Sequence, residues 1–250
     1  MIAPGAARRA ASGAACRRPA SAVLAAAALG LLAACAGPAP APAGKEWRFP
    51  EYELSLRVPE NWRAEDVYAL HARRAGVSEA EARALPLDDL VRRDPLLLLA
   101  HPPSDSGASA ICMLSVSVED LTRFPQVDTA RAFAELAEQA ARRNLPGYEK
   151  LGQDEEMAAG AAPAVRRDCR ALQPIEGQPR PVRNLTLFLK RQGLGITVAA
   201  YELDERFADR RADFERILAS VRLGPPAGRP GPFRRLLRWL SGSSDYSSSK

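Results

Sequence analysis

Histidine is nearly absent from this chain, and so are the residue patterns on which most enzymes depend. Among 250 residues there are two histidines, His71 and His101, which have neither metal-ligand spacing nor a nucleophile as partner. No Gly-x-Ser-x-Gly elbow occurs, and Cys112 falls inside an expected strand, which is a poor position for a reactive thiol. The sequence therefore predicts a protein that is not an enzyme, with no catalytic residue, no metal site and no cofactor.

A long apolar run is also missing. The uncharged apolar stretch at residues 22–34 is shorter than the roughly 20 residues that span a bilayer as a helix. It follows the arginines Arg8, Arg9, Arg17 and Arg18. A basic start, a short apolar segment and small residues before a boundary are typical of an export signal that is later removed. We therefore expect residues 1–34 to be a signal peptide.

The end of this stretch resembles the bacterial lipobox. Residues 32–35, Leu-Ala-Ala-Cys, show its pattern of an aliphatic residue, two small residues and a cysteine. The resemblance implies that the Cys35 thiol receives a diacylglycerol, that the signal is cut just before it, and that the new amine is acylated. Because two membrane signals already suffice for stable anchoring, three acyl chains would hold the protein on the membrane. The alternative is an ordinary secretory signal with Cys35 incidental.

The lipobox also predicts the cellular location. We expect a lipid-anchored protein of the bacterial cell envelope that faces the periplasm. Ala36, rather than an aspartate, follows the cysteine, which favours the outer membrane over the inner one. Residues 35–45 then form a linker with prolines at 38, 40 and 42, and proline keeps such a spacer extended.

An excess of one charge sign is absent from the expected folded domain. The formal net charge of +5 comes from the two ends of the chain, because residues 46–224 contain 25 basic and 29 acidic side chains. Residues 225–250 contain five basic side chains and one acidic side chain. A domain with this balance has no electrostatic footprint for nucleic acid, so nucleic acid is excluded as a partner.

Cysteine is scarce as well. Cys16 leaves with the signal and Cys35 is assigned to lipid, so that Cys112 and Cys169 remain in a compartment that permits disulfides. A bond across that long loop would contribute on the order of 4 kcal/mol in the chain-entropy model. We favour this disulfide. The alternative is two buried thiols on separate strands, because the two Cα atoms must lie within about 7 Å to pair.

Hydrophobic periodicity predicts an ordered domain over residues 46–224. Between residues 52 and 58, apolar residues alternate with polar ones, which is typical of a strand with one solvated face. Gln192 and Gly193 predict a tight hairpin. The expected strands are residues 52–58, 96–100, 110–118, 148–157, 164–172, 183–191 and 194–201, and the expected helices are two or three short ones within 64–94, then 128–144 and 204–220. Neighbouring strands joined by hairpins, with helices before and between them, predict an α+β domain with a largely antiparallel β-sheet flanked by helices.

Two stretches of this domain resemble PsbP/Mog1-like domains, including the DcrB-type lipoproteins. Residues 52–62, YELSLRVPENW, are similar to their first strand and turn, and residues 214–223, FERILASVRL, resemble their final helix, which ends at a serine before a hydrophobic residue. The order of elements from 46 to 224 fits as well, although the helical insert at 64–94 is longer than we expect of that family. The resemblance implies an α-β-α sandwich and an accessory or binding role, and it transfers no catalytic residue.

Residues 225–250 form a basic tail with a short amphipathic segment. Apolar residues recur at i, i+3, i+4 and i+7, three arginines take the other side, and a tryptophan adds to the segment, which suits an anionic lipid surface or a partner groove. The residues are Phe233, Arg234, Arg235, Leu236, Leu237, Arg238, Trp239 and Leu240. Eight residues are too few to hold a helix alone in water, so we favour a flexible tail, with membrane or partner contact as the alternative.

Two functions remain after these exclusions. The first is a non-catalytic envelope lipoprotein that is tethered to the membrane through Cys35 and binds another envelope protein as an accessory module. The second is a carrier of a small hydrophobic or lipidic ligand. The first predicts a filled core with an exposed apolar patch. The second predicts a closed apolar pocket of several hundred Å³.

Overall fold

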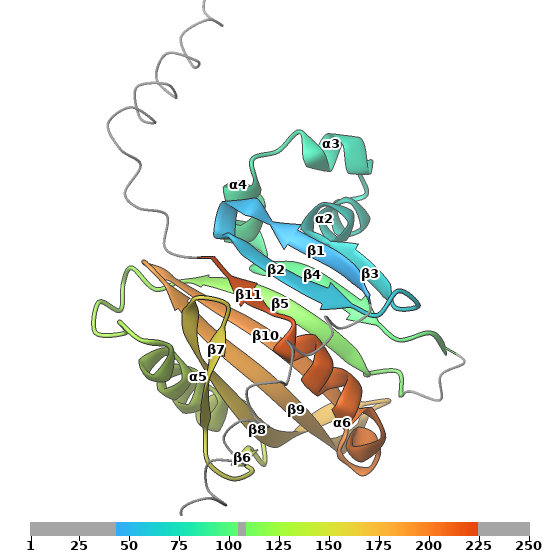
Figure 1. Ribbon diagram of the computed structural model, residues 1–250. Coiled ribbons are helices and arrows are strands. Elements are labelled where there is room, and N and C mark those ends of the chain that lie inside the picture. Colours follow the sequence, from blue (N-terminus) through green and yellow to red (C-terminus); the bar gives the residue numbers. More distant parts are fainter. Residues whose placement is uncertain (1–43, 105–108, 225–250) are drawn as a thin grey trace, which may run out of the picture. The chain divides into compact units, whose positions relative to one another are not determined.

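An antiparallel sheet of eight strands is the frame of the structure, a computed structural model that describes residues 44–104 and 109–224 (Figure 1). In spatial order the strands are β3 (Arg63–Asp66), β4 (Leu96–His101), β5 (Met113–Asp120), β10 (Leu194–Leu203), β9 (Gln178–Arg191), β8 (Ala162–Ile175) and β6 (Glu149–Lys150), and β7 (Glu155–Ala159) also pairs with β8. All of these pairings are antiparallel. The α+β class with a largely antiparallel sheet flanked by helices, which the sequence predicts, is confirmed.

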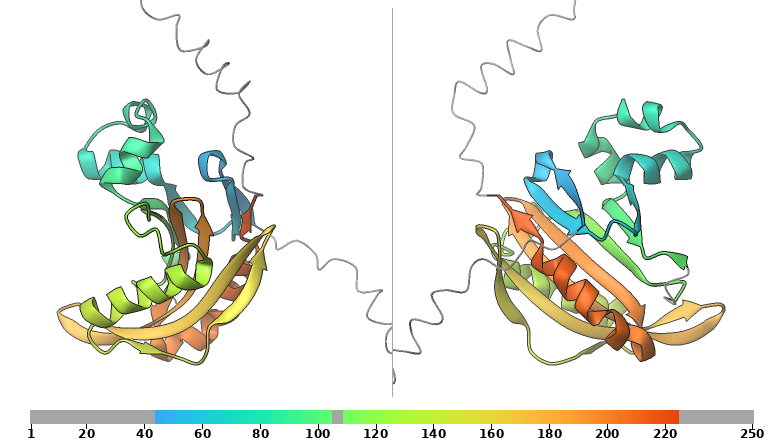
Figure 2. Two further views of the ribbon diagram at one scale, coloured as in Figure 1. Left: turned by 90° about the vertical axis from the view of Figure 1, so that its left-hand side faces the viewer. Right: turned by 45° about the vertical axis from the view of Figure 1, so that its right-hand side comes forward.

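Two tight turns set the register of the three longest strands. Gln192, at a φ of 48°, and Gly193 join β9 to β10, so that Arg191 pairs with Leu194. Glu176 and Gly177, with φ values of 51° and 78°, join β8 to β9. Two consecutive positive φ angles give a turn whose twist matches that of the flanking strands. The resulting β8–β9 hairpin is longer than the sequence indicates, and its tip projects from the domain in the right-hand view of Figure 2.

A second, smaller sheet is placed over one face of the large one. It consists of β1 (Lys45–Phe49), β2 (Leu54–Val58) and β11 (Arg222–Leu223), with β2 in the centre. A 3₁₀ turn at Pro50–Tyr52 connects β1 to β2. Along β2 the burial alternates as expected, so that Leu54, Leu56 and Val58 are buried. The first and last strands of the domain thus meet on β2.

Five helices complete the described domain. They are α2 (Val67–Ala75), α3 (Glu79–Arg83), α4 (Leu87–Arg93), α5 (Ala130–Asn144) and α6 (Asp204–Ala219). Ser78 and Glu81 form the expected capping box of α3, and Thr129 caps α5 by accepting from the amide of Ala132. No helix within the described residues is long and apolar enough to cross a membrane.

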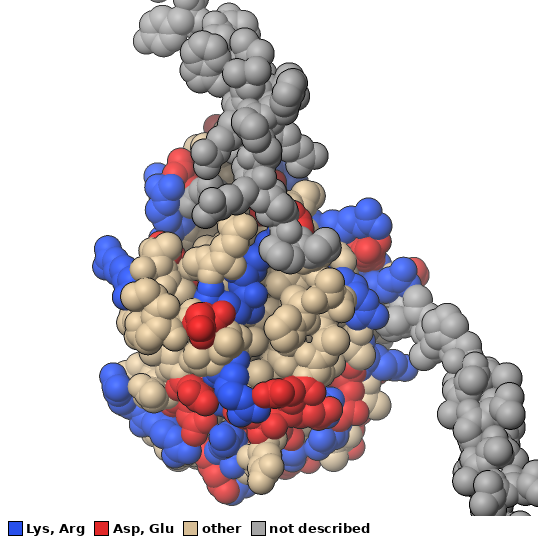
Figure 3. All heavy atoms as spheres, turned by 60° about the vertical axis from the view of Figure 1, so that its left-hand side comes forward, with Lys and Arg blue, Asp and Glu red and all other residues tan. Residues whose placement is uncertain are grey.

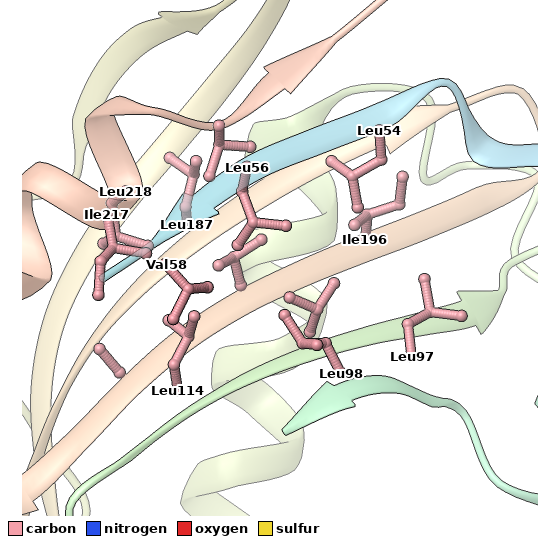
Figure 4. Close-up of a cluster of buried hydrophobic side chains, with 14 of the residues drawn as sticks. Leu54, Leu56, Val58, Leu97, Leu98, Leu114, Leu187, Ile196, Ile217 and Leu218 are labelled. Atoms are coloured by element: carbon pink, nitrogen blue, oxygen red, sulfur yellow. The ribbon is translucent and has the colours of Figure 1, made fainter. Parts of the chain in front are cut away.

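The main core lies between the small sheet with α6 and one face of the large sheet, here called the core face. A row of buried residues crosses four strands of that face, from Leu187 through Val198 and Val116 to Leu98. Leu54 and Leu56 of β2 and Ile217 of α6 pack on it from the other side (Figure 4). Because burying one leucine side chain contributes about 1.5–3 kcal/mol, this layer is the chief source of the domain's stability.

The opposite face of the large sheet, here called the α5 face, is covered only in part. Helix α5 packs on β8 and β9, while α6 lies on the other side of the sheet (Figure 2). Phe133 of α5 meets Phe188 of β9 edge to face, with ring centroids 5.6 Å apart. The rest of this face, over β5 and the ends of β9 and β10, has no helix of the described residues on it.

Several elements differ from the sequence-based expectations. β1, β3 and β11 are strands that the sequence analysis did not foresee, and the predicted strand at 148–157 is broken into β6 and β7. The favoured disulfide between Cys112 and Cys169 is wrong, because both thiols are free. Cys112 directly precedes β5, whereas Cys169 lies on β8, and the strands β10 and β9 run between them. At about 4.8 Å per strand spacing, that separation exceeds the reach of a disulfide.

The serine that ends the last helix fixes α6 to the small sheet. The Ser220 hydroxyl accepts from the Arg57 amide at 2.8 Å and donates to the Ile217 carbonyl at 2.6 Å. Ser220→Ala leaves the Arg57 amide without this acceptor, so we expect a loss of about 1–3 kcal/mol in the free energy of unfolding. Urea denaturation measures it. Ser55→Ala on the same strand is the matched control and should change stability by less than about 0.5 kcal/mol; equal losses would contradict the role of Ser220.

Candidate functional site

An uncharged cleft lies on the uncovered part of the α5 face, and we call it the hairpin cleft. Its volume is about 280 Å³. It is bounded by the part of the β8–β9 hairpin next to its turn, the start of β5 and the end of β10. The lining consists of apolar residues with three polar ones: Ile111, Met113, Ala171, Gln173, Pro174, Ile175, Val182, Asn184 and Tyr201. On a chain that is 26% charged, this cleft stands out because its lining has no charged side chain.

Hydrogen bonds across neighbouring strands hold the polar side chains of the hairpin cleft. Oδ1 of Asn184 accepts from Sγ of Cys169 at 2.9 Å and from Oγ1 of Thr186 at 3.0 Å. The amide is thereby oriented so that its Nδ2 is the end that can donate to a bound group. Burial raises the pKa of the Tyr201 hydroxyl. The floor of the cleft is therefore neutral at physiological pH.

A buried carboxylate anchors the segment that carries Ile111 into this cleft. Glu202 of β10 has no exposed surface, and it accepts from the hydroxyl of Ser109, from the amide of Ser109 at 3.4 Å and from the amide of Leu203 at 2.8 Å. The segment from Ser109 to Cys112 then turns back through a backbone bond of 3.0 Å. Glu202 is not among the residues predicted from the sequence, although an acid inside an apolar strand is a signal that could have identified it.

The two free thiols are poor nucleophiles. Burial, together with the nearby Glu202, raises the pKa of Cys112. Burial also raises the pKa of Cys169 to about 11. A thiol must ionise before it attacks an electrophile or binds a metal, so both cysteines remain protonated and unreactive near neutral pH. Cys112 fills space in the main core, and Cys169 is buried on β8 with its thiol donating to Asn184.

A second, larger cleft lies on the core-face side, between α4 and the 3₁₀ turn, and we call it the insert cleft. Its volume is about 580 Å³. Five of its lining residues are apolar or aromatic: Tyr52, Val91, Pro95, Val118 and Leu194. Of the polar ones, Arg92 lies on α4, and Glu119, Asp120 and Thr122 lie at or just after the end of β5. Figure 3 shows the side of the domain that includes these elements, and uncharged residues occupy much of its middle. This cleft combines an apolar floor with charged groups at its mouth.

A buried ion cluster holds α5 on the sheet beside these sites. Nε and Nη2 of Arg167 bind the two carboxylate oxygens of Asp154 at 2.8 and 2.7 Å, and Nη1 donates to the Ala134 carbonyl of α5 at 2.6 Å. Glu138 of α5 lies 3.2 Å from the same guanidinium, and the Phe188 ring packs under it with its centroid at 5.3 Å. The hydrogen bonds from Arg167 hold the pKa of Asp154 below its usual range. This cluster is structural, since its donors are directed to protein atoms.

Most of the residues that the sequence predicts to be functional do not line either cleft. Cys35 and the tail segment 233–240 lie outside the described residues. His71 is on α2, and Nδ1 of His101 lies 3.3 Å from the carbonyl of Cys112. Among the described residues no group of three or more His, Cys, Asp or Glu side chains is placed to hold a metal ion. The fold and the two clefts define an α+β domain that offers open, mainly apolar binding surfaces.

Comparison with solved structures finds several that are similar to this chain at low sequence identity. The chain is similar to cyanobacterial PsbP (CyanoP) from Synechocystis sp. PCC 6803, with 12% identity and a TM-score of 0.46 over 76% of this chain and 99% of that one. It is similar to LpqN, involved in cell envelope biogenesis of Mycobacterium tuberculosis, with 17% identity and a TM-score of 0.38 over 74% and 87%. It is also similar to PA94 of Pseudomonas aeruginosa, with 12% identity and a TM-score of 0.39 over 74% and 98%. No family model and no curated protein matches the sequence.

Proposed function

We propose that this chain is a non-catalytic lipoprotein of the bacterial cell envelope, anchored through lipid on Cys35, whose PsbP/Mog1-like domain binds another envelope protein at the hairpin cleft. The observation that carries the proposal is the uncharged lining of that cleft on an otherwise ion-rich surface. Arginine–carboxylate pairs cover the neighbouring surface, such as Arg170 with Glu149 at 2.7 Å and Arg180 with Glu205 at 2.7 Å. Interfaces are commonly centred on an apolar anchor in a desolvated pocket with a polar rim.

The size of the hairpin cleft favours a partner side chain over an enclosed ligand. Pockets that bury a drug-sized molecule usually measure about 300–1,000 Å³. The hairpin cleft falls below that range and opens to solvent. It suits one or two apolar side chains of a protein partner, with Nδ2 of Asn184 available to bind a backbone carbonyl.

The alternative function is a carrier of a small hydrophobic or lipidic ligand. The apolar lining with Tyr201, Asn184 and Gln173 as orienting polar groups is also the chemistry of a ligand pocket. Native mass spectrometry of the protein from its own host distinguishes the two functions. A carrier retains a non-covalent small molecule of constant mass, whereas an accessory module retains a protein or nothing.

Site-specific photo-crosslinking in the native host tests the proposal. A photoreactive residue in place of Met113 should give one defined protein adduct, while the same residue in place of Leu85, an exposed leucine far along the chain from the cleft, should not. Ile111→Asp places a charge in the cleft and should reduce the Met113 adduct at least fivefold, because a desolvated carboxylate opposes an apolar anchor. Identical adducts from both positions, or an adduct with lipid alone, would contradict partner binding at this cleft.

The anchor is tested in the same cells. Cys35→Ser removes the thiol that the lipobox pattern assigns to acylation. The protein should then move from the membrane fraction to the soluble fraction. Without the acyl chains, the tail segment 233–240 is the expected membrane contact, and one such contact gives only marginal binding. If the Cys35→Ser protein stayed on the membrane to the same extent, the tether would have to lie elsewhere in the chain.

A further inference from the structure

The described domain ends at the edge of the insert cleft. The amide of Gly224, its last residue, donates to the carbonyl of Glu53 at 2.9 Å. The neighbouring residue, Tyr52, lines the cleft. Residues 225–250 therefore continue from a point beside the cleft, whatever path they take afterwards.

We propose that residues 233–240 of this same chain occupy the insert cleft. Phe233, Leu236, Leu237 and Leu240 recur at i, i+3, i+4 and i+7, which is the anchor spacing of a helix bound in a groove. They would fill the apolar floor of the cleft, and the three arginines beside them would reach the Asp120 carboxylate at its mouth. The tail is then an intramolecular ligand of the domain.

The linker between Gly224 and Phe233 is long enough to reach the cleft and short enough to keep the segment near it. Residues 225–232 join Gly224 to Phe233, and a chain of this length reaches at most roughly 30 Å. The prolines and glycines of this linker disfavour a helix, which would otherwise hold the segment away from the cleft. A short linker of this kind gives an effective concentration in the millimolar range, so even a weak intrinsic affinity produces substantial occupancy.

The apolar chemistry of the two parts is complementary. The cleft, at about 580 Å³, has room for several large side chains above Tyr52, Val91, Val118 and Leu194. An isolated eight-residue helix is not stable in water, because too few hydrogen bonds compensate for the ordering of its backbone. A groove that buries its apolar side provides the missing stabilisation.

The charges are complementary as well. The residues 46–224 carry a net charge of −4, with 25 bases and 29 acids, and residues 225–250 carry +4, with five bases and one acid. Asp120, which lines the cleft, is exposed at the end of β5 and lies on the same side of the sheet as Val118. Arg92 also lines the cleft, but its charge is offset by Asp89 at 3.3 Å. A guanidinium from the tail would compensate the Asp120 carboxylate.

Photo-crosslinking within the full-length, lipidated protein in detergent tests this docking. A photoreactive residue in place of Leu236 should crosslink within the chain, and mass spectrometry should map the product to peptides containing Tyr52, Val91 or Leu194. The matched control places the same residue at Ser243, beyond the amphipathic segment, and should give at least fivefold less of these products. Equal yields from the two positions, or no crosslink within the chain, would overturn the proposal.

Charge variants separate specific docking from chance contact. Replacing Arg234, Arg235 and Arg238 by glutamine leaves the folded domain untouched and should lower the crosslink yield at least threefold. Asp120→Asn should have the same effect, and the introduced amide side chain keeps an oxygen for the amide of Thr122, from which Asp120 accepts at 2.8 Å. Glu156→Gln removes the same charge from the exposed start of β7 and should leave the yield unchanged. Products that join two chains, or that join the tail to lipid, would assign the segment to a second copy or to the membrane and so contradict intramolecular docking.

Discussion

Arg167→Met should lower the free energy of unfolding by about 3–5 kcal/mol, which is the usual result of removing one partner from a buried ion pair. The Arg167 side chain is 1% exposed, and its removal leaves the buried carboxylate of Asp154 with the more distant ammonium of Lys150, at 3.8 Å. The substitution also removes the donor to the Ala134 carbonyl, which attaches α5 to the sheet. Because most domains are stable by only about 5–15 kcal/mol, this loss is a large part of the total.

Urea denaturation followed by tryptophan fluorescence measures this effect, and the adjacent residue provides the control. Arg166→Met is the same substitution one position along β8, where Arg166 pairs with the exposed Glu155. An exposed pair of this kind contributes at most about 1 kcal/mol. Asp154→Leu added to Arg167→Met should recover part of the stability, because it removes the uncompensated carboxylate. Similar losses for Arg166→Met and Arg167→Met would show that the buried cluster has no special role.

The same cluster predicts a pH dependence. Arg167 lowers the pKa of Asp154 in the folded state. A carboxyl group with a lowered folded pKa contributes stability that is present above its ordinary pKa of about 4 and is lost as the pH falls through the folded value. The wild-type protein should therefore lose this contribution in acid. The Arg167→Met variant lacks this contribution at every pH. The difference in the free energy of unfolding between wild type and variant should therefore shrink below about pH 4.

The sequence predicts those elements whose residue pattern alone shows which side chains are buried or where the element begins. β2 alternates between buried leucines and solvated residues, and α3 carries both halves of its capping box, so each is recognisable from a few residues. β1 and β3 were missed because their sequences, KEWRF and RAED, are rich in charge. They are strands because β2 and β4 offer them a hydrogen-bonding edge, and edge strands with charged residues are a common feature of natural sheets.

The candidate sites depend on strand order, which local patterns do not contain. The hairpin cleft brings Ile111, Val182 and Tyr201 together from separate parts of the chain, through the order β5-β10-β9-β8. The same order separates Cys112 from Cys169 and excludes the expected disulfide. A signal for the buried cluster was present, however, because Arg167 takes an inward position between Val165 and Cys169 along β8. A charged residue at such a position predicts a buried partner.

Gly195→Ala should destabilise the domain by about 1–3 kcal/mol, the usual cost of adding a methyl group to a well-packed core. Gly195 lies on β10, opposite Glu119 of β5, and the ring of Phe133 packs directly on it. A Cβ atom at this position would lie 2.6–2.8 Å from three ring carbons of Phe133, which is closer than van der Waals contact allows. Because that ring is itself held edge to face by Phe188, it cannot move away without opening the contact between α5 and the sheet.

A second-site change distinguishes this clash from the ordinary effect of replacing a strand glycine. Phe133→Leu alone should also destabilise the domain, because it leaves a cavity beside Phe188. In the double variant with Gly195→Ala, however, the shorter leucine makes room for the new methyl group. Its loss in the free energy of unfolding should therefore be smaller than the sum of the two single losses by at least about 1 kcal/mol. Thermal and urea unfolding of the four proteins measure the coupling. Additive losses would mean that the ring does not rest on Gly195 and that α5 is attached to the sheet through its contacts with β8 and β9 instead.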